Sequence, residues 1–128
     1  MGKKLVAVFS LAVLLALLSG CVVQSQPTSG TGNMVRMGPD NFFTTSITIK
    51  KGQSIIFSDD QATGTTHILV IGQQGAPKAE DGAPDFGTNG IMTNPGDNKS
   101  SPPFMTPGIY HVTCTIHPQM NLTITVTA

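Results

Sequence analysis

The sequence has no tryptophan and few charged residues, and the charges that it does have are balanced. Seven Lys and Arg residues face seven Asp and Glu residues, and charged residues make up 11% of the chain. The basic residues form no cluster beyond the pairs Lys3-Lys4 and Lys50-Lys51, whereas binding to nucleic-acid phosphates needs a basic patch. The composition therefore argues against nucleic acid as a partner.

The chain is also too short for a two-domain enzyme with a cleft between its domains. At 128 residues it allows one domain, since domains usually span roughly 100–200 residues. Fourteen Gly and nine Pro, with abundant Thr, Ile and Val, favour turns and strands over helices. We therefore expect an all-β domain.

No apolar run in the sequence is long enough to span a bilayer of about 30 Å comfortably. Residues 5–18 are apolar except for Ser10, and they follow the basic pair Lys3-Lys4, which is the layout of a secretory signal. The run then ends in Leu18-Ser19-Gly20-Cys21, which resembles a bacterial lipobox and implies cleavage before Cys21 with lipid attached to its thiol. An ordinary signal peptide with a coincidental Cys is the alternative.

These features divide the chain into three parts. We expect a lipoprotein signal peptide at residues 1–20, a lipidated Cys21 and a flexible polar tether at 21–33, and a folded domain at 34–128. The protein is then extracytoplasmic and lipid-anchored on the periplasmic or cell-surface side of a prokaryotic membrane. We also expect it to be a monomer.

Within the domain, alternating or continuous apolar runs separated by Gly and Pro predict about seven to eight short strands. In the run 109–114, Tyr110, Val112 and Cys114 share one face, while His111 and Thr113 share the other. Such a pattern is typical of a β-sandwich. The expected strands cover residues 44–49, 54–57, 66–71, 90–93, 104–105, 109–114 and 122–126.

The sequence contains only two cysteines, and lipid on Cys21 leaves Cys114 as an unpaired thiol in an oxidising compartment. His117 and Met120 follow it closely, at the point where one predicted strand ends and the next begins. A thiolate, an imidazole and a weak axial thioether are ligands that select copper in a trigonal electron-transfer site. Such a site needs a second imidazole, and His67, at the start of a buried strand, is the best candidate.

The run PGIYHVTCTIHPQM at residues 107–120 resembles the C-terminal copper-binding motif of type 1 (blue) copper proteins, the cupredoxins. The spacing from Cys to His to Met is most similar to that of amicyanin, within the plastocyanin/amicyanin-like group, and the segment 43–57 resembles the early strand pair of the family. The resemblance implies a Greek-key β-sandwich over about residues 34–128. It also implies one type 1 copper ion bound by four ligands, His67, Cys114, His117 and Met120.

The resemblance further implies a one-electron carrier that cycles Cu(II) and Cu(I) and docks transiently to redox proteins near His117. Ile116, Pro118 and Phe104 are candidates for the docking patch. The sequence departs from the family at Ile68, where relatives often have Asn, Ser or Thr. Thr65, Thr66 and Thr115 are candidate substitutes.

Two other functions are alternatives to electron transfer. A copper-binding module for copper handling or sensing would use the same four ligands. An enzyme would need a second copper site, but the chain has only three His, and His111 is predicted to point away from Cys114. We therefore expect no enzymatic activity.

The remaining candidates are interpreted as packing or surface residues. Met34, Met37, Met92 and Met105 show no cluster, and Glu80, Asp81 and Asp85 are expected in a solvated loop.

Overall fold

A computed structural model describes residues 32–128 and shows nine strands and no helix within them. The expected signal peptide, Cys21 and most of the tether lie outside the described residues. No helix in the described part of the chain is long and apolar enough to cross a membrane. The strands are β1 (Met34–Met37), β2 (Ser46–Lys50), β3 (Ile56–Asp59), β4 (His67–Gln73), β5 (Ala76–Pro77), β6 (Ile91–Thr93), β7 (Asn98–Ser100), β8 (Gly108–Cys114) and β9 (Asn121–Thr127).

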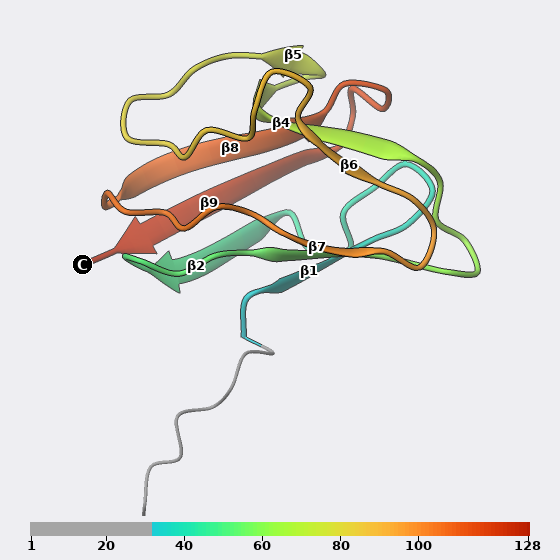
Figure 1. The fold of residues 1–128 in the computed structure, drawn as a ribbon, viewed down its shortest axis with the longest axis horizontal. Coiled ribbons are helices and arrows are strands. Elements are labelled where there is room, and N and C mark those ends of the chain that lie inside the picture. The colour runs from blue at the N-terminus through green and yellow to red at the C-terminus, as the bar shows by residue number, and fades with distance from the viewer. Residues whose placement is uncertain (1–31) are drawn as a thin grey trace, which may run out of the picture.

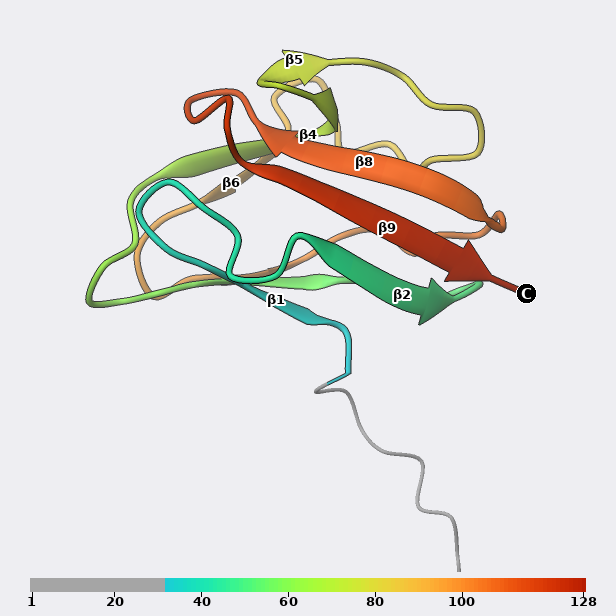
Figure 2. The ribbon, with the colours of Figure 1, turned by 180° about the vertical axis from the view of Figure 1, so that it is seen from behind.

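The strands form two sheets, and the predicted all-β sandwich is confirmed. One sheet has the order β1-β3-β7, and the other has the order β2-β9-β8-β4-β5 with β6 paired to β4. Both β1 with β3 and β2 with β9 pair in parallel, so each of these pairs joins strands that a hairpin cannot connect. Figures 1 and 2 show β8 and β9 running beside each other above β1.

The register brings the start of β4 and the end of β8 to the same end of the sandwich. Leu69 lies opposite Cys114 in the antiparallel pair of β4 and β8, while His67 lies opposite Thr93 on β6. The loop that joins β8 to β9 is at this end, and the C-terminus is at the other end of β9 (Figure 1).

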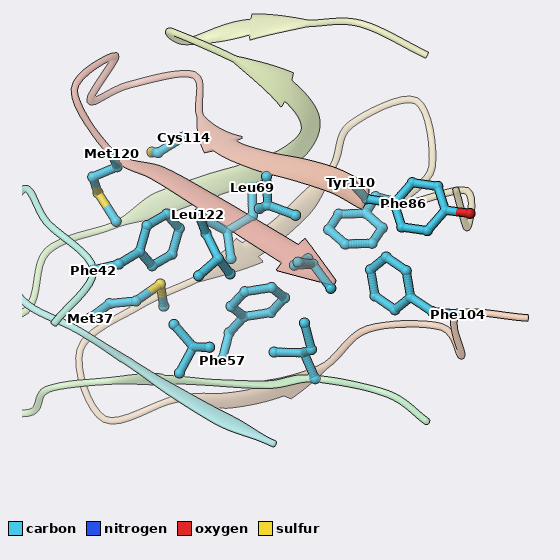
Figure 3. Packing of buried hydrophobic residues seen from close by; sticks show 14 of the residues in the cluster. Met37, Phe42, Phe57, Leu69, Phe86, Phe104, Tyr110, Cys114, Met120 and Leu122 are labelled. Carbon is cyan, nitrogen blue, oxygen red and sulfur yellow. The ribbon is translucent and has the colours of Figure 1, made fainter. Parts of the chain in front are cut away.

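The core lies between the sheets and consists of the inward residues that strand alternation predicts. On β8 the buried residues Tyr110, Val112 and Cys114 alternate with partly exposed ones, except that Thr113 is buried as well. Figure 3 shows Cys114 and Met120 at one end of this core and Phe104 at the other. Other core residues are Val35, Met37, Phe42, Ile49, Ile55, Phe57, Leu69, Phe86, Leu122, Ile124 and Val126.

The sequence prediction was wrong for one strand and missed three. No strand forms at residues 104–105, because Pro102, Pro103 and Pro107 flank Phe104 and lack the N–H groups that a ladder needs. Phe104 instead exchanges hydrogen bonds with the turn at residues 52–53. The missed strands β1, β5 and β7 are the short ones at sheet edges.

Candidate metal centre

Three side chains from separate parts of the chain converge at one end of the sandwich. His67 is the first residue of β4, Cys114 is the last residue of β8, and His117 lies in the loop between β8 and β9. The Cys114 sulfur is 3.8 Å from Nδ1 of His67 and 3.7 Å from Nδ1 of His117. The two nitrogens are 3.3 Å apart. The structure therefore brings together three of the four ligands predicted from the sequence through atoms that can bind one ion.

The triangle formed by these three atoms has the dimensions of a metal site. A triangle with these sides has its centre about 2 Å from each corner, and a first-row ion such as zinc binds imidazole nitrogen at about 2.0–2.1 Å and thiolate sulfur at about 2.3 Å. Two imidazoles and one thiolate in a trigonal arrangement are the donors of blue-copper sites. The residues present therefore fit a single copper ion.

The ring of His67 is oriented by a hydrogen bond on its outer side. Its Nε2–H donates to the carbonyl oxygen of Gly38 at 3.0 Å, and the side chain is fully buried. With a proton on Nε2, Nδ1 is the atom that faces Cys114. In the protonated ring Nδ1 donates to the sulfur, and in the neutral ring its lone pair is free to bind an ion. The bond thus selects both the tautomer and the ring orientation.

The buried sulfur of Cys114 lies among hydrogen-bond donors. Burial raises the pKa of its thiol, but hydrogen bonds from His67 and from backbone amides that include Ile68 lower it by more, so that the pKa falls to about 6. Burial also lowers the pKa of His67, but Cys114 and the nearby Asp59 outweigh that effect and raise it. Cys114 is therefore a thiolate at neutral pH, the form that binds metals.

The backbone of Ile68 supplies contacts that its side chain cannot. Its amide contributes to the hydrogen bonds on the Cys114 sulfur, and its carbonyl accepts the N–H of Thr115 at 2.9 Å. Two of the three candidate substitutes have their hydroxyls engaged elsewhere, Thr65 with the Pro39 carbonyl and Thr66 with Asn94. An apolar residue at position 68 is thus compatible with an ordered ligand loop.

Met120 closes the loop that carries His117. Its N–H donates to the His117 carbonyl at 2.9 Å, and its carbonyl accepts the Thr113 hydroxyl at 2.8 Å and the Cys114 N–H at 3.4 Å. The side chain is buried at the same end of the core as Cys114 (Figure 3). Its role as an axial thioether ligand stays a prediction.

Comparison with known proteins assigns the family. Residues 30–127 match the family model described as copper binding proteins, plastocyanin/azurin family. The chain belongs to the plastocyanin/azurin family of copper-binding proteins. None of the curated proteins matches the chain.

Solved structures of cupredoxins share the fold. Amicyanin from Paracoccus versutus is similar with a TM-score of 0.55 and 19% identity, covering 80% of this chain and 86% of that one. A reduced amicyanin variant gives a TM-score of 0.57 at 20% identity, with 76% and 83% covered. A purple cupredoxin from Nitrosopumilus maritimus gives 0.53 at 17% identity, with 73% and 98% covered.

The two imidazoles of this cupredoxin site differ in their exposure. His67 is fully buried, whereas His117 is half-buried in a loop whose neighbouring residue, Ile116, is 48% exposed. Pro118 is exposed as well. The prediction that Phe104 belongs to the same patch was wrong, because Phe104 is fully buried against Tyr110 at the far end of the core (Figure 3).

The third histidine of the cupredoxin is held outside the metal centre. His111 lies on the opposite face of β8 from Cys114, as its position in the alternation predicts. Its backbone N–H and its Nδ1 each contact a carboxylate oxygen of Glu80 at 2.8 Å. Glu80 is therefore half-buried against β8, and the expectation that it lies in a solvated loop was wrong.

The methionines that the sequence places outside the metal centre do not gather at one point. Met37 is in the core, and Met34, Met92 and Met105 are exposed.

Sequence reasoning missed one residue beside the site. Asp59 ends β3, and its buried side chain has Oδ1 at 3.8 Å from Nε2 of His67. Burial raises the pKa of this carboxyl, and the hydrogen bond from Thr93 and the proximity of His67 reduce the rise without cancelling it. The signal in the sequence was alternation, because Ile55, Phe57 and Asp59 occupy successive inward positions.

Proposed function

We propose that this cupredoxin is a one-electron carrier that cycles a single copper ion between Cu(II) and Cu(I) at an extracytoplasmic membrane surface. The observation that carries the proposal is the asymmetry of the ligands. Two of them, His67 and Cys114, are fully buried, while the third, His117, reaches the surface beside an exposed apolar residue. When bound, copper supplies the one-electron couple, and the protein supplies a fixed cage with one path to the outside.

The residues around the cage favour transfer with little rearrangement. His67 is fixed by the Gly38 carbonyl, and the Cys114 backbone is tied to that of Met120. A cage that is already ordered presents the same donors to both oxidation states. Burial of Cys114 and Met120 also keeps water from these donors.

We further propose that redox proteins dock transiently over His117. Ile116 and Pro118 are exposed next to it and supply an apolar surface. Self-exchange between oxidised and reduced copies measures transfer through this surface without an identified partner. Ile116→Lys should slow self-exchange and leave the reduction potential unchanged.

The membrane location is supported by the order of features at the N-terminus. A basic pair, an apolar run, Leu18-Ser19-Gly20-Cys21 and a polar segment precede the first described strand. Lipid on Cys21 would hold the copper domain at the outer face of a membrane.

The proposal is tested by adding Cu(II) to the purified protein and recording its visible spectrum. We expect an intense thiolate-to-copper band that disappears on reduction with ascorbate and returns on reoxidation over many cycles in the presence of a chelator. Cys114→Ser should abolish the band while the fold is retained. His111→Ala is the matched control, because this His is held by Glu80 outside the site, and the band should persist.

The alternative function, a module for copper handling or sensing, predicts a different outcome. Such a protein would lose its copper to the chelator during cycling, and that result would contradict the electron-carrier proposal. A groove of about 380 Å³ lies between β4 and the loop at residues 77–88, and its lining includes none of the four predicted ligands.

A further inference from the structure

Asp59 is a buried acid whose carboxylate is only half satisfied. Its Oδ2 accepts a hydrogen bond from the Thr93 hydroxyl at 3.1 Å, while its Oδ1 has no hydrogen-bond partner among residues 32–128. The side chain has no solvent exposure. A buried carboxylate without full hydrogen bonding is unfavourable, so its presence calls for a compensating interaction.

The unpartnered oxygen faces a predicted copper ligand. Oδ1 lies 3.8 Å from Nε2 of His67, on the side of the ring opposite the metal-binding nitrogen. The gap is too long for a hydrogen bond, and the Nε2–H already donates to Gly38. The contact is therefore electrostatic, between two side chains that are both fully buried, where charges are weakly screened.

The other charges around Asp59 do not neutralise it. Asp60 and Asp97 are both acidic, and Arg36 pairs with Asp60 at 3.2 Å on the surface. The protein group of positive character that faces Oδ1 is the His67 ring, which becomes more positive when its Nδ1 binds a cation. Carboxylates placed behind metal-binding histidines orient the ring and make it a stronger ligand.

The backbone of Asp59 connects the end of β3 to the turn at residues 96–97. The Asp59 N–H donates to the Asp97 carbonyl at 2.9 Å, and the Asp59 carbonyl accepts the N–H of Gly96 at 3.2 Å. Both bonds survive a change of side chain. Oδ2 holds the Thr93 hydroxyl, which leaves Oδ1 free to act on His67. A variant that keeps the Thr93 contact therefore separates the effect of the charge from that of the fold.

We propose that Asp59 is a positioning residue for the copper centre, whose negative charge behind His67 orients the ring and favours Cu(II) over Cu(I), so that the reduction potential is lowered. This inference rests on the copper site and not on the identity of any redox partner. It would hold equally if the protein handled copper rather than carried electrons.

Asp59→Asn tests the proposal because it removes the charge and keeps the shape. The amide can turn its oxygen toward His67 and its NH2 toward the Thr93 hydroxyl. Loss of such a partner typically weakens metal binding by about 10–100-fold. We expect the affinity for Cu(II) to fall about tenfold relative to that for Cu(I). For a one-electron couple this equals a rise of about 59 mV in the reduction potential, measured by titration with a redox mediator that supplies or accepts the electron.

The affinity for Zn(II), a divalent ion without redox chemistry, is the second readout and should also fall about tenfold. Asp60→Asn is the matched control. It removes the same charge one residue away, from a side chain that is partly exposed and paired with Arg36. Both quantities should stay near their wild-type values in this control.

A potential and a Zn(II) affinity in Asp59→Asn that match those of Asp60→Asn would overturn the proposal. Thermal unfolding of the metal-free proteins shows whether each variant is folded. Should Asp59→Asn not fold, Asp59→Ser removes the same charge with a smaller polar side chain. The same rise in potential is expected for Asp59→Ser, and its absence would equally reject the role assigned to Asp59.

Discussion

The thiol of Cys114 shows how a buried group can be ionised at neutral pH. Its pKa falls to about 6 because hydrogen bonds from His67 and the backbone outweigh the effect of burial. We expect the ultraviolet thiolate absorbance of the metal-free protein to be present at pH 7 and to disappear as the pH falls through about 6. The difference spectrum between wild type and Cys114→Ser isolates the contribution of this thiol. A midpoint near the ordinary value of 9.0 would contradict the hydrogen bonding described at the sulfur.

Met120 is expected to tune the copper rather than to hold it. A long axial thioether contributes little to binding but affects the potential. In Met120→Gln, copper should stay bound and the reduction potential should fall, because a harder oxygen donor favours Cu(II). Met105→Gln makes the same chemical change at an exposed position at the far end of the core and should leave the potential unchanged. Equal potentials in the two variants would make Met120 a packing residue only.

At the residue scale, local spacing in the sequence was sufficient for most of the site. Cys114, His117 and Met120 lie at the end of β8 and in the short loop that follows it, so their proximity follows from the order of the chain. His67 required an inference from the chemistry of copper, and the structure places it at the centre. Alternation along β3 marks Asp59 as an inward residue, but its position beside His67 comes from β3 packing against the start of β4, which no local pattern shows.

At the scale of elements, a hairpin turn supports the ligand loop from outside. The turn between β4 and β5 contains Gln74 and Gly75, both with positive φ, at 53° and 77°. The N–H of Gly75 donates to the Thr113 hydroxyl at 2.9 Å, and that hydroxyl in turn donates to the Met120 carbonyl. Gly75 also lies directly against Pro118. The geometry of the copper loop therefore depends on a turn that contributes no ligand.

Gly75→Ala should disturb the copper site from this position. A Cβ at residue 75 would lie 2.9 Å from the Cβ of Pro118 and would push the loop. Gly52→Ala is the matched control, since its φ is also positive, at 87°, but no atom lies within 4 Å of the added carbon. Each variant should lose about 1–2 kcal/mol of unfolding free energy from backbone strain. Only Gly75→Ala should shift the visible copper band, and identical spectra in both would show that the turn does not support the loop.

The strands that the sequence predicted well are the long ones with alternating apolar residues. Expected strands at 109–114 and 122–126 correspond to Gly108–Cys114 and Asn121–Thr127. Short edge strands such as β5 and β7 have no buried residues, so no apolar alternation marks them. The false strand at 104–105 arose because Phe104 is buried, but as a core side chain between prolines rather than as part of a ladder.

At the scale of the whole molecule, the N-terminal segment is expected to determine where the copper domain works. Cys21→Ala should block lipid attachment, so the protein should be released from membranes or remain unprocessed. Fractionation and N-terminal analysis of the mature protein measure both outcomes. Ser25→Ala, a change within the expected tether, should leave the protein in the membrane fraction. Wild-type protein that is wholly soluble with an N-terminus other than residue 21 would contradict the anchor.

The parallel pairing of β2 with β9 also has a consequence for how the protein matures. Ser46 on β2 pairs with Thr123 on β9, so β2 can take its place in the sheet only after β9 has been made. Contacts between such distant parts of a chain form slowly, and a chain emerges from its N-terminus first. Cys114 pairs with β4, but His117 and Met120 lie between β8 and β9, so the loop that carries them closes only when β9 pairs with β8. We therefore expect the copper centre to be completed only after β9 has been made, so that loading with metal is the closing step of biogenesis rather than its nucleus.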